Sequence, residues 1–222
     1  PMKTDRLIGK YKIEPCPRNV EYHYKVTYNK LDRILYYTRL YKSRRNLENE
    51  INMKNIDFIH AHTLFADGGL AYQLNKKYGI PYIVAVRSTD IKEYLRKMPH
   101  CLIYLNKIIK NAVKIVFISP NMQQDLEKFL TQKTKKILKE KAIIKPNGIE
   151  SYWFDNINTP QDKENIKKLN FVQVSELDKN KNLFATIELI QKLNDAGYEA
   201  NLTVVGTGRE EENYKKFVIE NG

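Results

Sequence analysis

The segment 57–90 constrains the fold of this chain more than any other stretch. A short apolar run over 58–61 is followed by a polar loop, an amphipathic helix and a second apolar run over 82–86. Gly79 stands where a helix commonly ends in the left-handed conformation, and Pro81 just beyond it cannot continue a helix. The order strand, helix, strand predicts a βαβ unit, and hence an α/β fold with parallel strands.

Polar residues follow both strands of this unit. In an open α/β sheet, ligands bind in the loops beyond the carboxyl ends of the strands. The residues placed there are His60, His62, Asp67, Arg87 and Asp90. The sequence therefore predicts a ligand site at this edge of the sheet.

The remaining segments predict more elements of the same kind. Before and after the βαβ unit we expect a strand over 20–26, a helix over about 29–53, a helix near 102–111, a buried strand over 113–118, and a short strand over 142–145 that ends at Pro146-Asn147-Gly148. Ser119 is placed to cap the next helix, with Pro120 at its first position.

The composition changes between 150 and 168, where Asn, Asp, Gln and Lys dominate, and this predicts a connection between domains. A second α/β unit follows, with strands over 171–174 and 201–205, a helix over 183–193 and a charged helix from Arg209. The predicted organisation is a first domain over 1–149, a linker over 150–168 and the start of a second domain over 169–222. Two strands alone cannot form a doubly covered sheet, so we expect the second domain to be cut short.

The composition excludes some classes of protein. With 42% hydrophobic residues the chain can bury a core, so it is no disordered basic tail. No apolar run approaches the roughly 18 residues that a spanning helix needs. Cys16 and Cys101 show no paired spacing, which indicates reduced thiols and a cytoplasmic protein.

The net charge of +12 is concentrated in two segments, 128–145 and 29–45. The first is rich in lysine and is most simply a solvated surface. The second interleaves basic residues with tyrosines, and there a membrane-binding face and a plain solvated face both stay open. On the first of these readings Tyr36, Tyr37 and Tyr41 lie at the membrane interface. Nucleic acid is an unlikely partner because no recognised DNA- or RNA-binding motif is present.

From residue 20 to its end, the order of motifs resembles glycosyltransferase family 4, a large group of retaining enzymes that use nucleotide sugars. The segment 57–62 matches a D-x-x-H-x-H strand end, and Asp67-Gly68 matches a following D-G. Further matches are 87–90 to R-G-T-D, Ser119 to a strand-ending serine, 146–150 to P-N-G-V-D, 174–182 to the opening of the donor-side domain, and 205–208 to V-G-x-G.

The resemblance implies a GT-B type double Rossmann-like fold, with parallel sheets covered by helices and an incomplete second domain. It implies transfer of a sugar from a nucleotide diphosphate sugar to a glycan or lipid-linked acceptor with retention, in surface polysaccharide synthesis. The nucleotide sugar is a co-substrate, and no metal or cofactor is implied. Carried over by position, Arg87 and Asp90 are catalytic, and His62, Asp67, Gly68, Ser119, Asn147, Gly148 and Lys181 bind substrate.

Two departures from the family pattern matter. Arg87 replaces the histidine of many members, and Glu176 stands at the usual arginine that binds the donor diphosphate. An anionic side chain beside a diphosphate is electrostatically unfavourable, so Lys179 is a candidate substitute. The family's paired glutamates would lie beyond Gly222, and its first strand before Pro1. We therefore expect a piece of a longer enzyme that transfers no sugar by itself.

Alternatives to these assignments remain. Arg87 and Asp90 could form a local ion pair that caps a helix from Ile91, and the Gly206–Gly208 segment is more simply a tight turn than a phosphate cradle. Zinc binding by His60 and His62 lacks further ligands at suitable spacing. At the level of function, the alternatives are a basic nucleic-acid-binding protein and another GT-B enzyme such as a sugar-nucleotide epimerase. The expected location is cytoplasmic, with peripheral attachment to the inner membrane face as an option.

Overall fold

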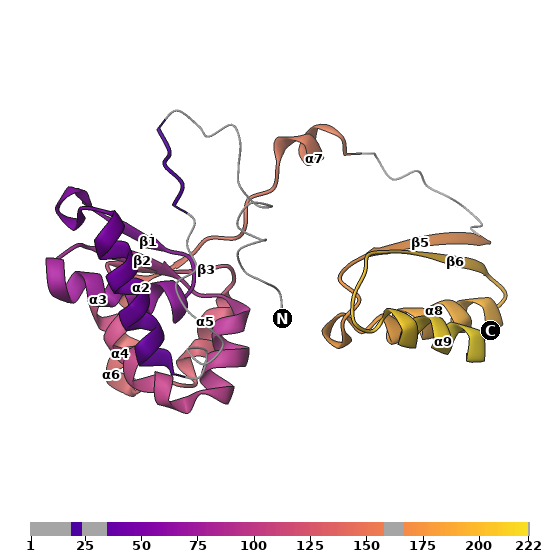
Figure 1. The fold of residues 1–222 in the computed structure, drawn as a ribbon. Helices are drawn as coiled ribbons and strands as arrows, with labels where there is room; N and C mark the ends of the chain where they lie inside the picture. The colour runs from indigo at the N-terminus through magenta and orange to yellow at the C-terminus, as the bar shows by residue number, and fades with distance from the viewer. Residues whose placement is uncertain (1–18, 24–34, 158–166, 222) are drawn as a thin grey trace. The chain divides into compact units, whose positions relative to one another are not determined.

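The computed structural model describes residues 19–23, 35–157 and 167–221. The chain divides into two compact units, Pro1–Ile149 and Glu150–Gly222 (Figure 1). The second unit takes in the segment 150–168 that the sequence assigns to a linker, and a short helix lies within that segment.

The first unit contains a parallel sheet. Its strands are β1 (Ile59–Ala61), β2 (Tyr82–Ala85), β3 (Lys114–Phe117) and β4 (Ala142–Ile144), and they lie side by side in the order β1-β2-β3-β4. Val84 and Ile115 are paired on the central strands and are fully buried. Apolar runs at 82–86 and 113–118 thus form buried parallel strands, as the sequence predicts.

Helices connect these strands and pack on the sheet. They are α2 (Tyr36–Glu50), α3 (Ala66–Tyr78), α4 (Leu102–Asn111), α5 (Pro120–Glu127) and α6 (Gln132–Lys141), with 3-10 turns at Met53–Asn55 and Pro99–Cys101 and a π-helix at Asp90–Leu95. Gly79 ends α3 in the left-handed conformation with φ 75°, and the hydroxyl of Ser119 accepts a hydrogen bond from Met122 N at 3.4 Å. Both predictions for these helix ends are confirmed.

Two adjacent glycines let α3 pack closely on its neighbours. A Cβ at Gly68 would lie 2.8 Å from Cγ2 of Val84 in β2, and one at Gly69 would overlap the hydroxyl of Tyr36 in α2. That hydroxyl is buried and donates a hydrogen bond to the carbonyl oxygen of Phe65 at 2.8 Å. The absence of side chains at these two positions therefore sets the spacing between α3, the sheet and α2.

The lysine-rich segment forms α6, and one of its lysines does not belong to a solvated surface. Thr134 and Leu138 are buried against the core, and Lys141 is half-buried. The Lys141 ammonium donates hydrogen bonds to the carbonyl oxygens of Lys110 at 2.6 Å and Ala112 at 2.7 Å, where α4 ends. These carbonyls have no partner within the helix, so Lys141 acts as a C-terminal cap for α4.

Replacing Lys141 by methionine is expected to lower the free energy of unfolding by about 1–2 kcal/mol, because it leaves those carbonyls without a charged donor. Hydrogen bonds to charged groups contribute about 1.5–3 kcal/mol, reduced here by partial solvent exposure. Lys139→Met on the exposed face of the same helix is the matched control. Urea unfolding should give a lower midpoint for Lys141→Met than for Lys139→Met, and equal unfolding midpoints would exclude the capping role.

The second unit contains two parallel strands in register, β5 (Lys168–Val174) and β6 (Glu199–Val205). Its helices are α7 (Ser151–Asp155), α8 (Leu183–Asp195) and α9 (Glu211–Asn221), with a 3-10 turn at Lys179–Lys181. Figure 1 shows α8 and α9 on the same side of the two strands. A small core forms there around Leu177, Leu183 and Tyr214.

Some predicted elements lie partly outside the described residues. The strand predicted over 20–26 does not form over 19–23, and residues 24–26 are not among those described. The helix predicted from 29 is described from Tyr36, because 24–34 also lie outside the described range. Within the described residues, no helix is long and apolar enough to cross a bilayer.

Candidate functional site

The carboxyl ends of the first-unit strands place most of the predicted site residues at one edge. Because all four strands are parallel, the residues that follow them emerge on the same side of the sheet. His62 and Asp67 follow β1, Arg87 and Asp90 follow β2, Ser119 follows β3, and Asn147 and Gly148 follow β4. The sheet thus gathers residues that are up to 86 positions apart in the sequence, from 62 to 148.

Arg87 links three of these strand ends. Its Nε donates a hydrogen bond to the carbonyl oxygen of His62 at 3.2 Å, and its Nη1 donates to Oδ1 of Asn147 at 3.4 Å. A guanidinium has five N–H donors in a planar fork, so these two bonds leave donors available for a ligand. The geometry holds a permanent positive charge between the ends of β1 and β4.

Asp90 is buried, with 1% of its surface exposed, and its carboxylate binds backbone groups. It accepts hydrogen bonds from the N–H groups of Leu64 at 3.0 Å, Phe65 at 3.2 Å and Arg87 at 2.8 Å. Burial raises the pKa of Asp90, while these three N–H donors act to lower it. The carboxylate therefore joins the loop after β1 to the loop after β2.

These contacts differ from the local ion pair that was an alternative for Arg87 and Asp90. Asp90 accepts from the backbone N–H of Arg87, whereas the Arg87 guanidinium is directed to His62 and Asn147. Asp90 also faces the first turn of α3, where the helix dipole favours a negative charge. The N-terminus of α3 is thus already occupied by a carboxylate.

The rings of His60 and His62 contact each other at the end of β1, tilted relative to each other. Their ring centroids are 4.3 Å apart with an angle of 33° between the ring planes, and both residues are exposed. Burial, and next the charges of His62 and Arg87, lower the pKa of His60. No group of three or more His, Cys, Asp or Glu residues suited to a metal ion occurs among the described residues.

The other predicted residues of this edge have local structural contacts. Oδ2 of Asp67 accepts a hydrogen bond from Thr63 Oγ1 at 3.1 Å, and Asp67 N donates to the same hydroxyl at 3.2 Å. Gly68 packs against β2 and Ser119 caps α5, so fold requirements account for both residue types. Thr63 was not among the sequence candidates, and only its position four residues before Asp67 could have indicated it.

In the second unit, Lys181 lies directly before α8. It ends the 3-10 turn Lys179–Lys181, and its side chain is exposed. Asn182 follows in the left-handed conformation with φ 49°, and its side chain makes no capping hydrogen bond. The first N–H groups of α8 therefore have no side-chain cap, and a lysine stands beside them.

Two further charged residues surround this helix start. Glu176 is exposed, and Nζ of Lys179 lies 4.0 Å from Oε1 of Glu210. The segment Gly206–Gly208 connects β6 to α9 and is bonded to the loop after β5: Leu177 donates its N–H to Thr207 O at 3.0 Å, and Glu210 N donates to Leu177 O at 3.0 Å. That this segment serves as a tight turn and not as a phosphate cradle stays a prediction.

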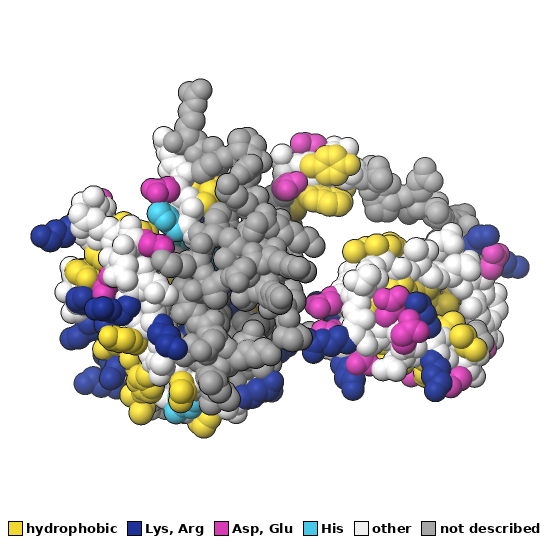
Figure 2. All heavy atoms as spheres, viewed as in Figure 1, with side chains coloured by type: hydrophobic (Ala, Val, Ile, Leu, Met, Phe, Trp, Pro, Cys, Tyr) yellow, Lys and Arg dark blue, Asp and Glu magenta, His cyan; other side chains and the backbone are white. Residues whose placement is uncertain are grey.

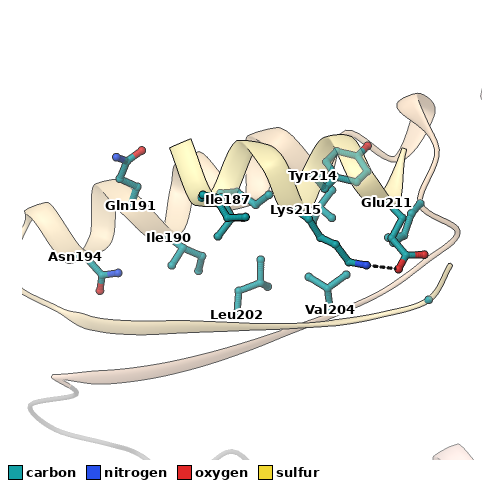
Figure 3. Close-up of a pocket in the computed structure, with 14 residues that line it drawn as sticks. Ile187, Ile190, Gln191, Asn194, Leu202, Val204, Glu211, Tyr214 and Lys215 are labelled. Carbon is teal, nitrogen blue, oxygen red and sulfur yellow. Dashed lines mark hydrogen bonds and ion pairs between the residues drawn. The ribbon is translucent and has the colours of Figure 1, made fainter. Parts of the chain in front are cut away.

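Neither of the two cavities described below is centred on these polar residues. A cavity of about 630 Å³ lies between α8, α9 and β6, and Figure 3 shows Ile187, Ile190, Leu202 and Val204 facing into it. Lys215 and Glu211 at its border bind each other at 2.8 Å. A smaller cavity of about 170 Å³ lies beside β1 and α3, with His60 and Asp67 among mostly apolar residues. We base the site on the strand ends, because both cavities are mainly apolar.

Helix α2, which carries the basic and tyrosine-rich segment, does not present all of the face that was expected to bind a membrane. Tyr36 is buried in the core, so the expectation that it lies at a membrane interface is wrong. Arg39 donates to the Tyr94 hydroxyl at 2.6 Å, and Arg44 binds Glu48 at 2.7 Å. Residues of 29–45 before Leu35 lie outside the described range, and Tyr37, Tyr41 and Arg45 are exposed on α2.

Parallel sheets, helical connections and polar residues at the strand ends define a Rossmann-like α/β protein. More narrowly, the chain belongs to glycosyltransferase family 4, whose model matches residues 5–150. No curated protein sequence matches the chain.

Among solved structures, the chain is similar to the apo structure of OtsA. The sequences are 14% identical, the TM-score is 0.53, and the match covers 88% of this chain and 49% of the OtsA chain. The chain thus spans about half the length of that protein. The predicted GT-B type of α/β fold is confirmed.

Proposed function

We propose that this chain is part of a retaining glycosyltransferase that moves a sugar from a nucleotide diphosphate sugar to a hydroxyl of a glycan or lipid-linked acceptor. We further propose that the reaction belongs to surface polysaccharide synthesis. The observation that carries the proposal is the convergence of Arg87, His62 and Asn147 at the strand ends of a family 4 chain. The first unit would hold the acceptor and the second the donor.

On the acceptor side, Arg87 is the residue best placed to contact a ligand. Its guanidinium is held at two points, so its free donors have a fixed direction before a substrate arrives. The exposed imidazole of His62 and carboxylate of Asp67 supply further hydrogen-bonding groups near the same edge. Asp90 would act there as a positioning residue, because its carboxylate is fully engaged with backbone N–H groups.

On the donor side, the start of α8 is suited to a diphosphate. Uncapped N–H groups and the helix dipole attract anions, and the adjacent Lys181 ammonium adds a full positive charge. The leaving diphosphate gains negative charge in the transition state, so fixed positive groups lower the barrier. Glu176 is exposed and therefore able to turn toward solvent, away from the phosphates.

The function is tested by incubating the longer enzyme of which we propose this chain to be part with a panel of nucleotide diphosphate sugars and candidate glycan acceptors. We expect nucleoside diphosphate release that depends on the acceptor, with a product that keeps the anomeric configuration of the donor in NMR spectra. Interconversion of the nucleotide sugar without an acceptor would indicate an epimerase instead. Thermal stabilisation by single-stranded RNA but by no nucleotide sugar would overturn the proposal in favour of a nucleic-acid-binding protein.

Replacing Lys181 by alanine is expected to weaken binding of a nucleoside diphosphate by about 10–100-fold, since a hydrogen bond to a charged group contributes about 1.5–3 kcal/mol. Isothermal titration with UDP, GDP and ADP measures the change. Lys192→Ala in the last turn of α8 is the matched control, because Lys192 is an exposed lysine of the same helix far from its start. Equal affinities of the two variants would exclude Lys181 from the phosphate site.

A further inference from the structure

Helix α4 presents an apolar side chain to solvent. Its inner side chains, such as Leu105 and Ile108, are fully buried, so this helix already contributes its apolar side to the core of the first unit. Ile103 lies on the other side of the helix and is 59% exposed. Lys107 and Lys110 follow it at the spacing of one helix face, and both are exposed. The outer face of α4 thus combines an isoleucine with two lysines.

Exposed tyrosines of α2 lie beside this face. Tyr37 and Tyr41 are about one helical turn apart and are 47% and 53% exposed. The ring of Tyr37 contacts the ring of Tyr104 in α4 edge to face, with the two centroids 4.9 Å apart. Nζ of Lys107 lies over the same Tyr104 ring, at 5.6 Å from its centroid. We name Tyr37, Tyr41, Ile103, Lys107 and Lys110 the α2–α4 surface.

The α2–α4 surface has little acidic charge around it. The sequence contains no Asp or Glu from 94 to 124. Glu48 in α2 is bound by Arg44 at 2.7 Å and by Lys77 at 3.1 Å, so its charge is balanced within the protein. The neighbouring helix α6 adds exposed charged residues, which are Lys133, Lys136, Lys139 and Glu140. Figure 2 shows hydrophobic and basic side chains interspersed, with few acidic ones, on the lower part of the first unit, where Figure 1 places α2, α4 and α6.

We propose that the α2–α4 surface binds an anionic lipid membrane, with Tyr37, Tyr41 and Ile103 at the level of the headgroups and the lysines against the lipid phosphates. Tyrosine is suited to this position because its ring is apolar and its hydroxyl is polar. A basic helical face that carries a few apolar residues lies in the plane of the membrane surface. The expected association is peripheral and sensitive to salt.

Charge and shape favour lipid over other partners of a basic surface. A second copy of the chain would bring the same lysines together in a symmetric contact, where like charges repel. Nucleic acid would bind the lysines through its phosphates, but those phosphates leave the exposed Ile103 without an apolar partner. A lipid surface offers phosphates for the lysines and acyl chains for Ile103 in the same layer.

The α2–α4 surface lies toward the edge of the sheet that carries the candidate site. Helix α4 ends at Asn111, and Val113 just after it donates its N–H at 2.8 Å to the carbonyl oxygen of Tyr82, the first residue of β2. The last turn of α4 is therefore at the amino ends of the strands, and its 10 residues extend about 15 Å toward the carboxyl ends. Ile103 in the first turn is thus on the side of Arg87. Docking would hold a lipid-linked acceptor near that edge, a link that rests on the proposed function.

Co-sedimentation of the 222-residue protein with lipid vesicles tests the docking. We expect binding to vesicles of phosphatidylglycerol and phosphatidylcholine at low salt, little binding to phosphatidylcholine alone, and loss of binding at high salt. Lys107→Gln combined with Lys110→Gln should weaken the binding by about 10–30-fold, because each basic residue near such a surface contributes about 1 kcal/mol, or about fivefold. Ile103→Ser should weaken it by about fivefold through the lost apolar contact.

Matched variants of the second unit control for general charge effects. Lys192→Gln combined with Lys216→Gln removes the same charge from exposed helix positions, and Ile219→Ser replaces an isoleucine that is 82% exposed. Neither control should weaken vesicle binding. Equal losses for the two double-lysine variants would overturn the proposal, and so would equal binding to both vesicle types or binding to neither.

Single-stranded RNA is the competitor that separates lipid from nucleic acid. RNA that binds the protein more tightly than the vesicles do, with an affinity that Ile103→Ser leaves unchanged, would assign the α2–α4 surface to nucleic acid and overturn the proposal. Vesicle binding needs neither a nucleotide sugar nor an acceptor. A failure of docking and a failure of the transferase function are therefore observed separately.

Discussion

Asp90→Ala is expected to lower the free energy of unfolding by about 3 kcal/mol or more, because it leaves three backbone N–H groups without their acceptor. The groups belong to Leu64, Phe65 and Arg87, and the carboxylate that binds them is almost completely buried. Chemical unfolding followed by circular dichroism measures the loss. Hydrogen exchange at Leu64 and Phe65 should accelerate together, since one side chain protects both.

Asp125→Ala is the matched control for this substitution. Asp125 is an exposed aspartate of the same unit that binds Lys128 at 2.6 Å, and surface ion pairs contribute about 0–1 kcal/mol. Asp90→Asn keeps one acceptor oxygen and should recover part of the loss, while its amide group opposes one of the N–H donors. A cost for Asp90→Ala no larger than that for Asp125→Ala would contradict the bridging role of the carboxylate.

Local sequence patterns were sufficient for most elements of the fold. Gly79 ends α3 and Ser119 begins α5 because their conformations depend on neighbours within a few residues. The apolar run at 113–118 predicted a buried strand, since parallel strands are covered on both faces. Strand order then placed the polar residues that follow each strand at one edge.

The interactions that the sequence did not reveal are formed by residues far apart in the chain. The acceptor role of Asp90 depends on N–H groups some 25 positions earlier, and Lys141 binds carbonyls about 30 positions earlier. Tyrosine is a residue type common at membrane interfaces, yet Tyr36 is buried. Gly69 has no side chain, and this leaves the space that the Tyr36 hydroxyl occupies. Charge and residue type alone cannot separate these core contacts from a solvated or membrane-facing surface.

The turn between β6 and α9 shows the same dependence on long-range contact. Gly206 has a φ of 146°, a conformation that residues with a side chain rarely adopt. A Cβ there would also overlap the carbonyl oxygen of Ser175, at the end of the neighbouring strand. Ser175 itself donates its N–H to Val205 O at 3.1 Å, which fixes the two strand ends against each other. Gly206 is thus required by its backbone angle and by close approach of another backbone.

Gly206→Ala is therefore expected to destabilise the second unit by about 3 kcal/mol or more, the sum of backbone strain and displacement of the Ser175 carbonyl. Gly197→Ala separates the two causes, because Gly197 also has a positive φ, of 89°, but a Cβ there would meet nothing within 4 Å. It should cost only about 1 kcal/mol. Hydrogen exchange of the β5 and β6 amides measures both effects within the unit. If Gly206 instead served mainly to cradle phosphate, Gly206→Ala would leave this exchange unchanged and abolish nucleoside diphosphate binding, which would contradict the turn assignment.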